Sequence, residues 1–93
     1  MTKEQTIEEL STIIDPEIGL DLYRLGLIYD ITINKDEVKV TMTYTTPFCP
    51  YGDALKTEVE YALRDIGFSQ VNIEVTFNPP WKAPDNLREM MGI

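Results

Sequence analysis

The chain has 93 residues, of which 43% are apolar, and it carries a formal net charge of −8. This length and composition predict one globular domain over residues 1–93. Binding to nucleic acid or to an anionic membrane surface needs clustered Lys and Arg, so the acidic charge argues against both kinds of partner.

The first predicted element is a helix over residues 2–14. Its apolar side chains recur at helical spacing, at Ile7, Leu10, Ile13 and Ile14. Two pairs of residues have the spacing of a capping box, Thr2 with Gln5 and Thr6 with Glu9. Pro16 makes helical geometry unfavourable at Asp15, so the helix is expected to stop there.

Residues 15–26 are expected to form a connector, which Gly19 and Gly26 punctuate. Two strands, at 27–33 and 37–45, follow it around a polar turn. In the second strand, Val38, Val40, Met42 and Tyr44 are predicted on the apolar face, and Lys39, Thr41, Thr43 and Thr45 on the polar face. This alternation predicts an antiparallel hairpin that lies on the core.

A second helix is predicted over residues 50–66, with Pro50 at its first position and Gly67 as its stop. Its apolar stripe comprises Tyr51, Leu55, Val59, Ala62, Leu63 and Ile66. A third strand over 71–77 should place Val71, Ile73, Val75 and Phe77 on one face. A short helix is expected after Asp85.

The predicted order is therefore α-β-β-α-β-α. A helix between the second and third strands usually joins a right-handed parallel pair. We expect an α+β fold, a two-layer α/β sandwich in which the helices pack on one face of a small mixed three-stranded sheet. The Thr and Asn residues of the opposite face would be solvated or would form a homodimer interface.

The sequence also predicts a cytoplasmic protein. No apolar run approaches the about 20 residues of a membrane span, and residues 1–5 lack the apolar core of a signal peptide. A single cysteine cannot form an internal disulfide, which fits a reducing compartment. The chain has no histidine, so the commonest general base and the commonest nitrogen ligand for metals are missing.

Cys49 is the strongest candidate for chemistry. It precedes Pro50 at the predicted start of the second helix, where free N–H groups and the positive end of the helix dipole gather. Both stabilise a thiolate, which is the form of cysteine that binds metal. The alternative is a small buried core residue. The loop setting between Pro47 and Pro50 favours the functional interpretation.

Two further groups are candidates for the same site. The hydroxyls of Thr45 and Thr46 could hydrogen-bond a ligand or the thiolate, although Thr is also ordinary in strands and turns. Asp15 and Glu17 could reach a metal or a partner. Asp15 could equally cap a short turn in which Pro16 takes the first position.

Three segments together resemble the SufT-like and PaaD-like iron–sulfur assembly domain family. They are Asp15-Pro16-Glu17-Ile18-Gly19 continuing to Leu25-Gly26-Leu27-Ile28-Tyr29-Asp30, then Thr43-Tyr44-Thr45-Thr46-Pro47-Phe48-Cys49-Pro50, and finally Pro79-Pro80-Trp81. The resemblance covers essentially the whole chain. It implies a compact α/β domain that helps to mature iron–sulfur proteins. Independently of the resemblance, Trp81 could be an aromatic anchor packed against the loops, although packing in the core is the default interpretation for this residue type.

The resemblance also implies a site made of Asp15, Glu17, Thr45, Thr46 and Cys49, with Cys49 as the metal ligand. A cluster usually needs four cysteine ligands, so Cys49 would share a cluster or iron with a partner. We therefore expect an accessory or carrier protein that is not an enzyme and has no permanently bound cofactor. Its partners would be the iron–sulfur assembly machinery and client apoproteins.

Two other functions are compatible with parts of the sequence. A thiol enzyme would use Cys49 as its nucleophile and Asp15 or Glu17 as its base, but carboxylates are poor bases for a thiol unless their pKa is raised. The order α-β-β-α-β also describes one form of the KH domain. That RNA-binding module needs a GXXG loop, which this sequence lacks.

Overall fold

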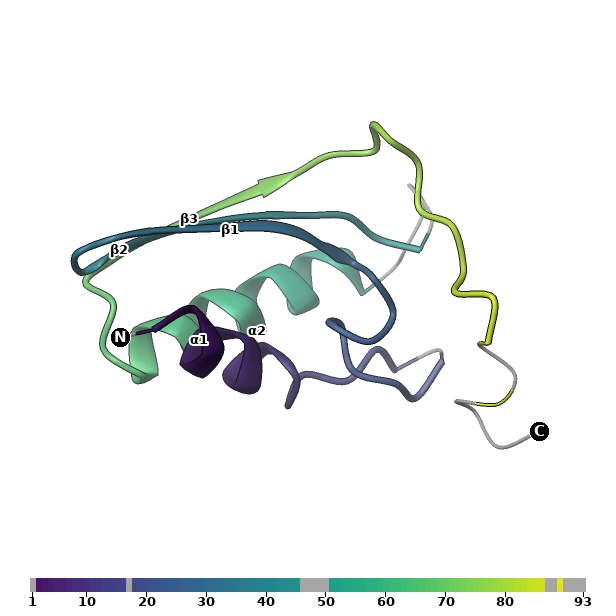
Figure 1. The fold of residues 1–93 in the computed structure, drawn as a ribbon, viewed down its shortest axis with the longest axis horizontal. Helices are drawn as coiled ribbons and strands as arrows, with labels where there is room; N and C mark the ends of the chain where they lie inside the picture. The colour runs from purple at the N-terminus through teal and green to yellow at the C-terminus, as the bar shows by residue number, and fades with distance from the viewer. Residues whose placement is uncertain (1, 17, 46–50, 87–88, 90–93) are drawn as a thin grey trace.

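The computed structural model describes residues 2–16, 18–45, 51–86 and 89. The elements follow one another as α1 (Lys3–Leu10), β1 (Ile28–Asn34), β2 (Glu37–Met42), α2 (Gly52–Asp65) and β3 (Gln70–Val75) (Figure 1). These five occur in the predicted order. The sixth predicted element, a helix after Asp85, falls largely outside the described residues.

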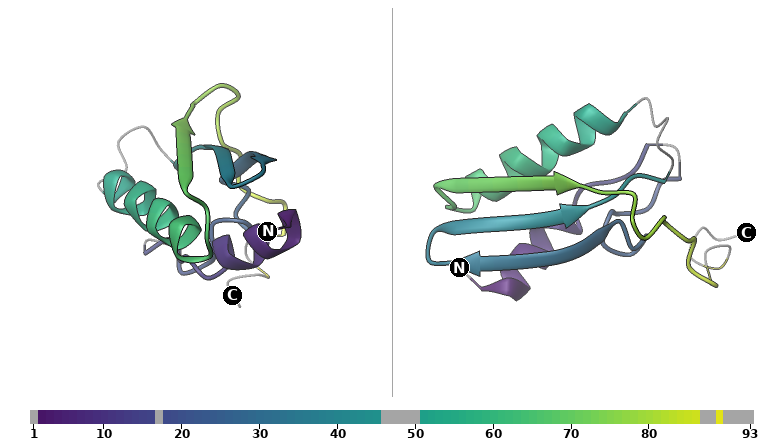
Figure 2. Two further views of the ribbon diagram at one scale, coloured as in Figure 1. Left: turned by 90° about the vertical axis from the view of Figure 1, so that its left-hand side faces the viewer. Right: turned by 90° about the horizontal axis from the view of Figure 1, so that it is seen from above.

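The three strands form one mixed sheet in the order β1-β2-β3. β1 and β2 are antiparallel, with a register shift between Ile28 and Asp30, whereas β2 and β3 are parallel. Both helices lie on the same face of the sheet (Figure 1), and the view from above shows the three strands side by side (Figure 2). The predicted two-layer α+β architecture is therefore confirmed.

The core lies between the sheet and the helices. Its buried apolar side chains include Leu20, Leu22, Leu25 and Leu27 from the connector, Val38, Val40 and Met42 from β2, and Leu55, Val59 and Leu63 from α2. The opposite face of the sheet is polar, because Thr32, Lys39 and Asn72 are exposed there. The connector thus supplies as much of the core as a regular element, and this fixes its path.

α1 begins with the capping box of Thr2 and Gln5, in which each side chain accepts a hydrogen bond from the other residue's backbone N–H. The second pair with this spacing does not form a box. Thr6 is buried inside the helix, and its hydroxyl donates to the Thr2 carbonyl at 2.9 Å. One of the two predicted caps is therefore confirmed.

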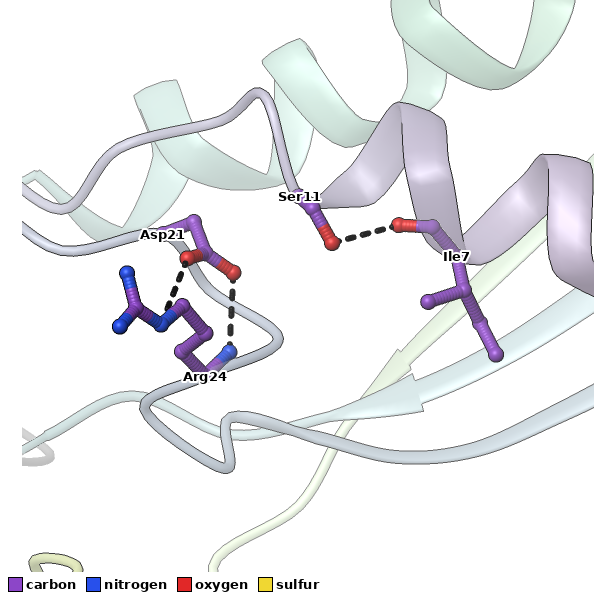
Figure 3. Close-up of polar contacts among 4 residues, drawn as sticks. All are labelled: Ile7, Ser11, Asp21 and Arg24. Carbon is purple, nitrogen blue, oxygen red and sulfur yellow. Dashed lines mark hydrogen bonds and ion pairs between the residues drawn. The ribbon is translucent and has the colours of Figure 1, made fainter.

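α1 ends at Leu10, earlier than predicted. The Ser11 hydroxyl donates to the Ile7 carbonyl at 2.8 Å (Figure 3), and the Thr12 hydroxyl donates to the Glu9 carbonyl at 2.7 Å. Such bonds offer the last carbonyls an alternative to further helical turns. Ile14 then lies beyond the helix and is 48% exposed, so its predicted place on the apolar stripe is wrong.

α2 begins at Gly52, with Tyr51 as its N-cap, so the predicted start at residue 50 is too early. Tyr51 is exposed and does not belong to the buried stripe. The helix ends at Asp65, and Gly67 follows shortly after it as the predicted stop, with a φ of 122° that glycine adopts without steric cost. The Gly67 N–H donates to the Arg64 carbonyl and the Phe68 N–H to the Leu63 carbonyl, which together form a Schellman motif.

Two strands stop earlier than the alternation predicts. β2 ends at Met42, and the next residue, Thr43, has 0% exposure instead of lying on the polar face. The cause is a backbone bond from the Thr43 N–H to the Leu27 carbonyl at 2.8 Å, which draws this residue into the core. β3 ends at Val75, which leaves Phe77 exposed beyond the strand.

Within the described ranges, no helix is long and apolar enough to cross a membrane.

Candidate functional site

The candidate site lies at one end of the molecule. The carboxyl ends of β2 and β3, the start of α2 and the middle of the connector all meet at the right-hand end of Figure 1, and the view from above in Figure 2 agrees. In the sequence, residues 46–50 lie between β2 and α2. In open sheets with parallel strands, ligands commonly bind beyond the carboxyl ends of the strands.

Asp15 is 1% exposed and closes a tight turn of the connector. Its backbone N–H donates to the Leu20 carbonyl at 2.9 Å, and its carbonyl accepts from the Gly19 N–H at 2.8 Å. Its carboxylate Oδ1 also accepts from the Ile18 N–H at 3.2 Å. The capping role that the sequence allowed for Asp15 is therefore confirmed. A buried carboxylate engaged in this way holds the shape of the connector.

Asp21 caps a second turn of the connector, a role that was not predicted from the sequence. This buried carboxylate accepts from the Arg24 N–H at 2.9 Å, and the Arg24 Nε lies 3.9 Å from its other oxygen (Figure 3). Its carbonyl also accepts from the Leu25 N–H at 3.1 Å. An Asp before a short run of helix-forming residues is the signal that could have identified this cap.

Thr45 is half-buried and lies in a bend after β2. Asp15 lies in the connector, and Thr45 lies three residues beyond the end of β2. The remaining predicted site residues, Glu17, Thr46 and Cys49, lie outside the described residues, as does Pro50. Among the residues that are described, no group of three or more acidic side chains converges to hold a metal ion.

The two sides of segment 46–50 are in direct contact through residues that the sequence analysis did not single out as a pair. Gly52, in the first turn of α2, is buried against the ring of Tyr44. A Cβ atom at Gly52 would lie only 2.7 Å from Tyr44 Cε2. The Tyr44 ring also packs edge-to-face against the ring of Phe77, with the two ring centroids 6.0 Å apart. This packing holds the end of β2 against the start of α2.

Trp81 is the predicted aromatic anchor, and the structure confirms that role. Its indole Nε1–H donates to the Leu25 carbonyl at 2.7 Å, and its ring packs against the core. Two residues earlier, the Pro79 carbonyl accepts from the Tyr29 hydroxyl at 2.8 Å. These bonds tie the segment after β3 to the connector and to β1, and so complete the same end of the molecule.

The fold is thus a small two-layer α+β domain in which the end of β2, the start of α2 and the connector meet at one end. The chain belongs to the iron–sulfur cluster assembly protein family, whose model matches residues 3–75. The predicted resemblance to SufT-like proteins is confirmed by relatives that are named as Fe-S protein maturation auxiliary factors. One is an "Fe-S protein maturation auxiliary factor" of Porphyromonas gingivalis, 40% identical over 97% of this chain and 88% of its own. Another is the "Fe-S protein maturation auxiliary factor SufT" of Staphylococcus aureus, 35% identical over 74% of this chain and 81% of its own.

Two other comparisons extend this assignment. An "Iron-sulfur cluster carrier protein" of Synechocystis is 30% identical over 99% of this chain, which spans 26% of that longer protein. A solved structure, of a conserved hypothetical protein from Thermotoga maritima, is 43% identical with a TM-score of 0.84, over 100% of this chain and 96% of its own. The chain therefore has a role in iron–sulfur cluster assembly or delivery. The three relatives described here have the names of auxiliary factors and of a carrier.

Proposed function

We propose that this protein is an accessory carrier that passes a transient iron–sulfur cluster, or iron, to client apoproteins through Cys49. The observation that carries the proposal is the packing of Gly52 against Tyr44, which joins both sides of the segment that contains Cys49. That segment also leads directly into the first turn of α2. No side chain caps that turn among the described residues, so the dipole and free N–H groups there favour an anionic sulfur.

Cys49 alone cannot hold a cluster, because clusters usually take four cysteine thiolates. In our proposal the partner supplies the remaining ligands, so that the cluster is cargo and is not retained. This separates a carrier from an enzyme with a resident cofactor. The partners are the assembly machinery and client apoproteins, and the net charge of −8 favours partners with a basic surface.

The other site residues take different parts. In the proposal, Thr45, Thr46 and Glu17 contribute hydroxyl and carboxylate groups to the same site as Cys49. Asp15 has an indirect role. Its buried carboxylate accepts a hydrogen bond from the Ile18 N–H, and this bond holds the connector turn between the two residues. The proposal also retains the expectations of a single domain over residues 1–93, a cytoplasmic location and a homodimer.

The test is to replace Cys49 by Ser and by Ala in cells that lack the native protein, and to measure the activity of iron–sulfur client enzymes. The matched control is Thr57→Ala on the exposed side of α2. We expect both Cys49 variants to lose client maturation while Thr57→Ala retains it. Thermal unfolding of the purified variants should match that of the wild type, and iron analysis should show less metal on the Cys49 variants. Full client maturation by Cys49→Ser would overturn the proposal.

A further inference from the structure

We propose that residues 77–84 form a strap that opens and closes as one unit, with Trp81 as its anchor. The strap leaves β3 and passes the end of the sheet on its way to the connector (Figures 1 and 2). It opens without unfolding of the rest of the domain, and the closed strap holds the end of β2 in place. This inference goes beyond the carrier function and does not depend on it.

The strap has few ties to the rest of the chain. The last backbone bond on the β3 side runs from the Thr76 N–H to the Met42 carbonyl at 2.9 Å, and residues 77–84 form no backbone–backbone hydrogen bond with any described residue. Six of these eight residues are exposed. Phe77, the first of them, packs edge-to-face on the Tyr44 ring and stays close to β3. Segments with so few bonds and so much exposure open at a low free energy.

Two hydrogen bonds hold the closed strap, and both use side chains. The Trp81 indole N–H donates to the Leu25 carbonyl at 2.7 Å, and the Tyr29 hydroxyl donates to the Pro79 carbonyl at 2.8 Å. The Trp81 ring is half-buried and packs against the core. When the strap lifts, water replaces both lost partners, so opening costs far less than separation of the strands and helices.

The anchor is connected to the end of β2 through the connector. Leu25 lies two residues before Leu27, whose carbonyl accepts from the Thr43 N–H at 2.8 Å. Thr43 directly follows β2 and is fully buried. Release of Trp81 frees the backbone at Leu25, and this loosens the bond between Leu27 and Thr43. The state of the strap is therefore transmitted to the carboxyl end of the central strand.

Hydrogen exchange of the full chain, followed by NMR, tests the proposal. The Trp81 indole N–H gives its own signal, because the chain has one tryptophan. We expect roughly a hundredfold protection relative to a free indole, the factor that partial burial of this side chain and one hydrogen bond provide. Low concentrations of urea should leave this rate unchanged, because local opening exposes little surface. The Thr43 amide should follow the indole, whereas the Val40 amide, in the central strand, should exchange more slowly and accelerate with urea.

Tyr29→Phe removes only the hydroxyl that donates to Pro79. It should raise the exchange rates of the Trp81 indole and the Thr43 amide by the same factor, about two- to tenfold. The matched control is Tyr61→Phe, which removes the same atom from a side chain that is 70% exposed and should leave both rates at the wild-type value.

The proposal is overturned if the Trp81 indole exchanges at the same rate and with the same urea dependence as the Val40 amide, because the strap then opens only with the whole domain. An unchanged indole rate in Tyr29→Phe would equally refute it. A faster indole with an unchanged Thr43 amide would refute the transmission to β2. These rates are measured without any client, so loss of the carrier function as an explanation would leave the strap intact.

Discussion

Replacing Trp81 by Phe should destabilise the protein measurably, because it removes one hydrogen bond and part of a ring from the candidate end of the fold. The indole N–H donates to the Leu25 carbonyl at 2.7 Å, and Leu25 is fully buried. Leaving a buried acceptor without its donor costs about 1–3 kcal/mol, and the smaller ring leaves a void that adds to the loss. We expect a decrease of about 2–3 kcal/mol in the free energy of unfolding, which for a domain of this size lowers the melting temperature by roughly 10 to 20 °C.

The assay should be urea unfolding followed by far-ultraviolet circular dichroism, because Trp81 is the only tryptophan and its fluorescence disappears in the variant. Tyr61→Phe is a suitable control, since Tyr61 is 70% exposed and surface substitutions usually change stability by less than about 0.5 kcal/mol. If Trp81→Phe is as stable as this control, the bond to Leu25 does not hold the segment after β3, and our account of this end of the molecule is wrong.

Two predictions concern the ends of the helices. Thr2→Ala removes the capping box of α1 and should lower the free energy of unfolding, measured by urea unfolding, by about 1 kcal/mol. The control is Thr12→Ala, which removes an exposed hydroxyl beyond the helix and should lower this free energy by less. An equal loss for both variants would contradict a special role for the capping box. Gly67→Ala forces a side chain into a positive φ and should cost about 1–2 kcal/mol in the same assay, whereas Ser69→Ala nearby keeps an ordinary backbone. An unchanged midpoint for Gly67→Ala would show that the Schellman motif tolerates a Cβ.

Most of the fold follows from local patterns. The alternation in β2 predicts Val38, Val40 and Met42 as core residues, and all three are buried. Gly67 marks the end of α2 correctly, since helix termination by glycine depends only on the local backbone. The predicted ends and faces of elements are wrong where a residue distant in the sequence, or a competing local hydrogen bond, determines the backbone conformation. Thr43 is buried by its bond to Leu27, which strand alternation cannot reveal.

The candidate site was only partly predictable, for the same physical reason. A cap by Asp15 can be inferred from the residues that follow it, because the carboxylate bonds to the N–H three residues later. The contact between Tyr44 and Gly52 depends on how β2 and α2 meet in space, and no spacing in the sequence encodes it. The choice of Leu25 as the partner of Trp81 is likewise a property of the folded chain.

The central place of β2 in the sheet has a consequence for how partners would be engaged. Its backbone pairs with a neighbour on each side, and its carboxyl end leads directly into segment 46–50. The end of β2 is therefore held in place before any other protein arrives. Ordering side chains and loops is a large part of the entropic cost of association. Because the end of β2 is already ordered, a partner that docks at this end of the molecule would pay less of that entropic cost.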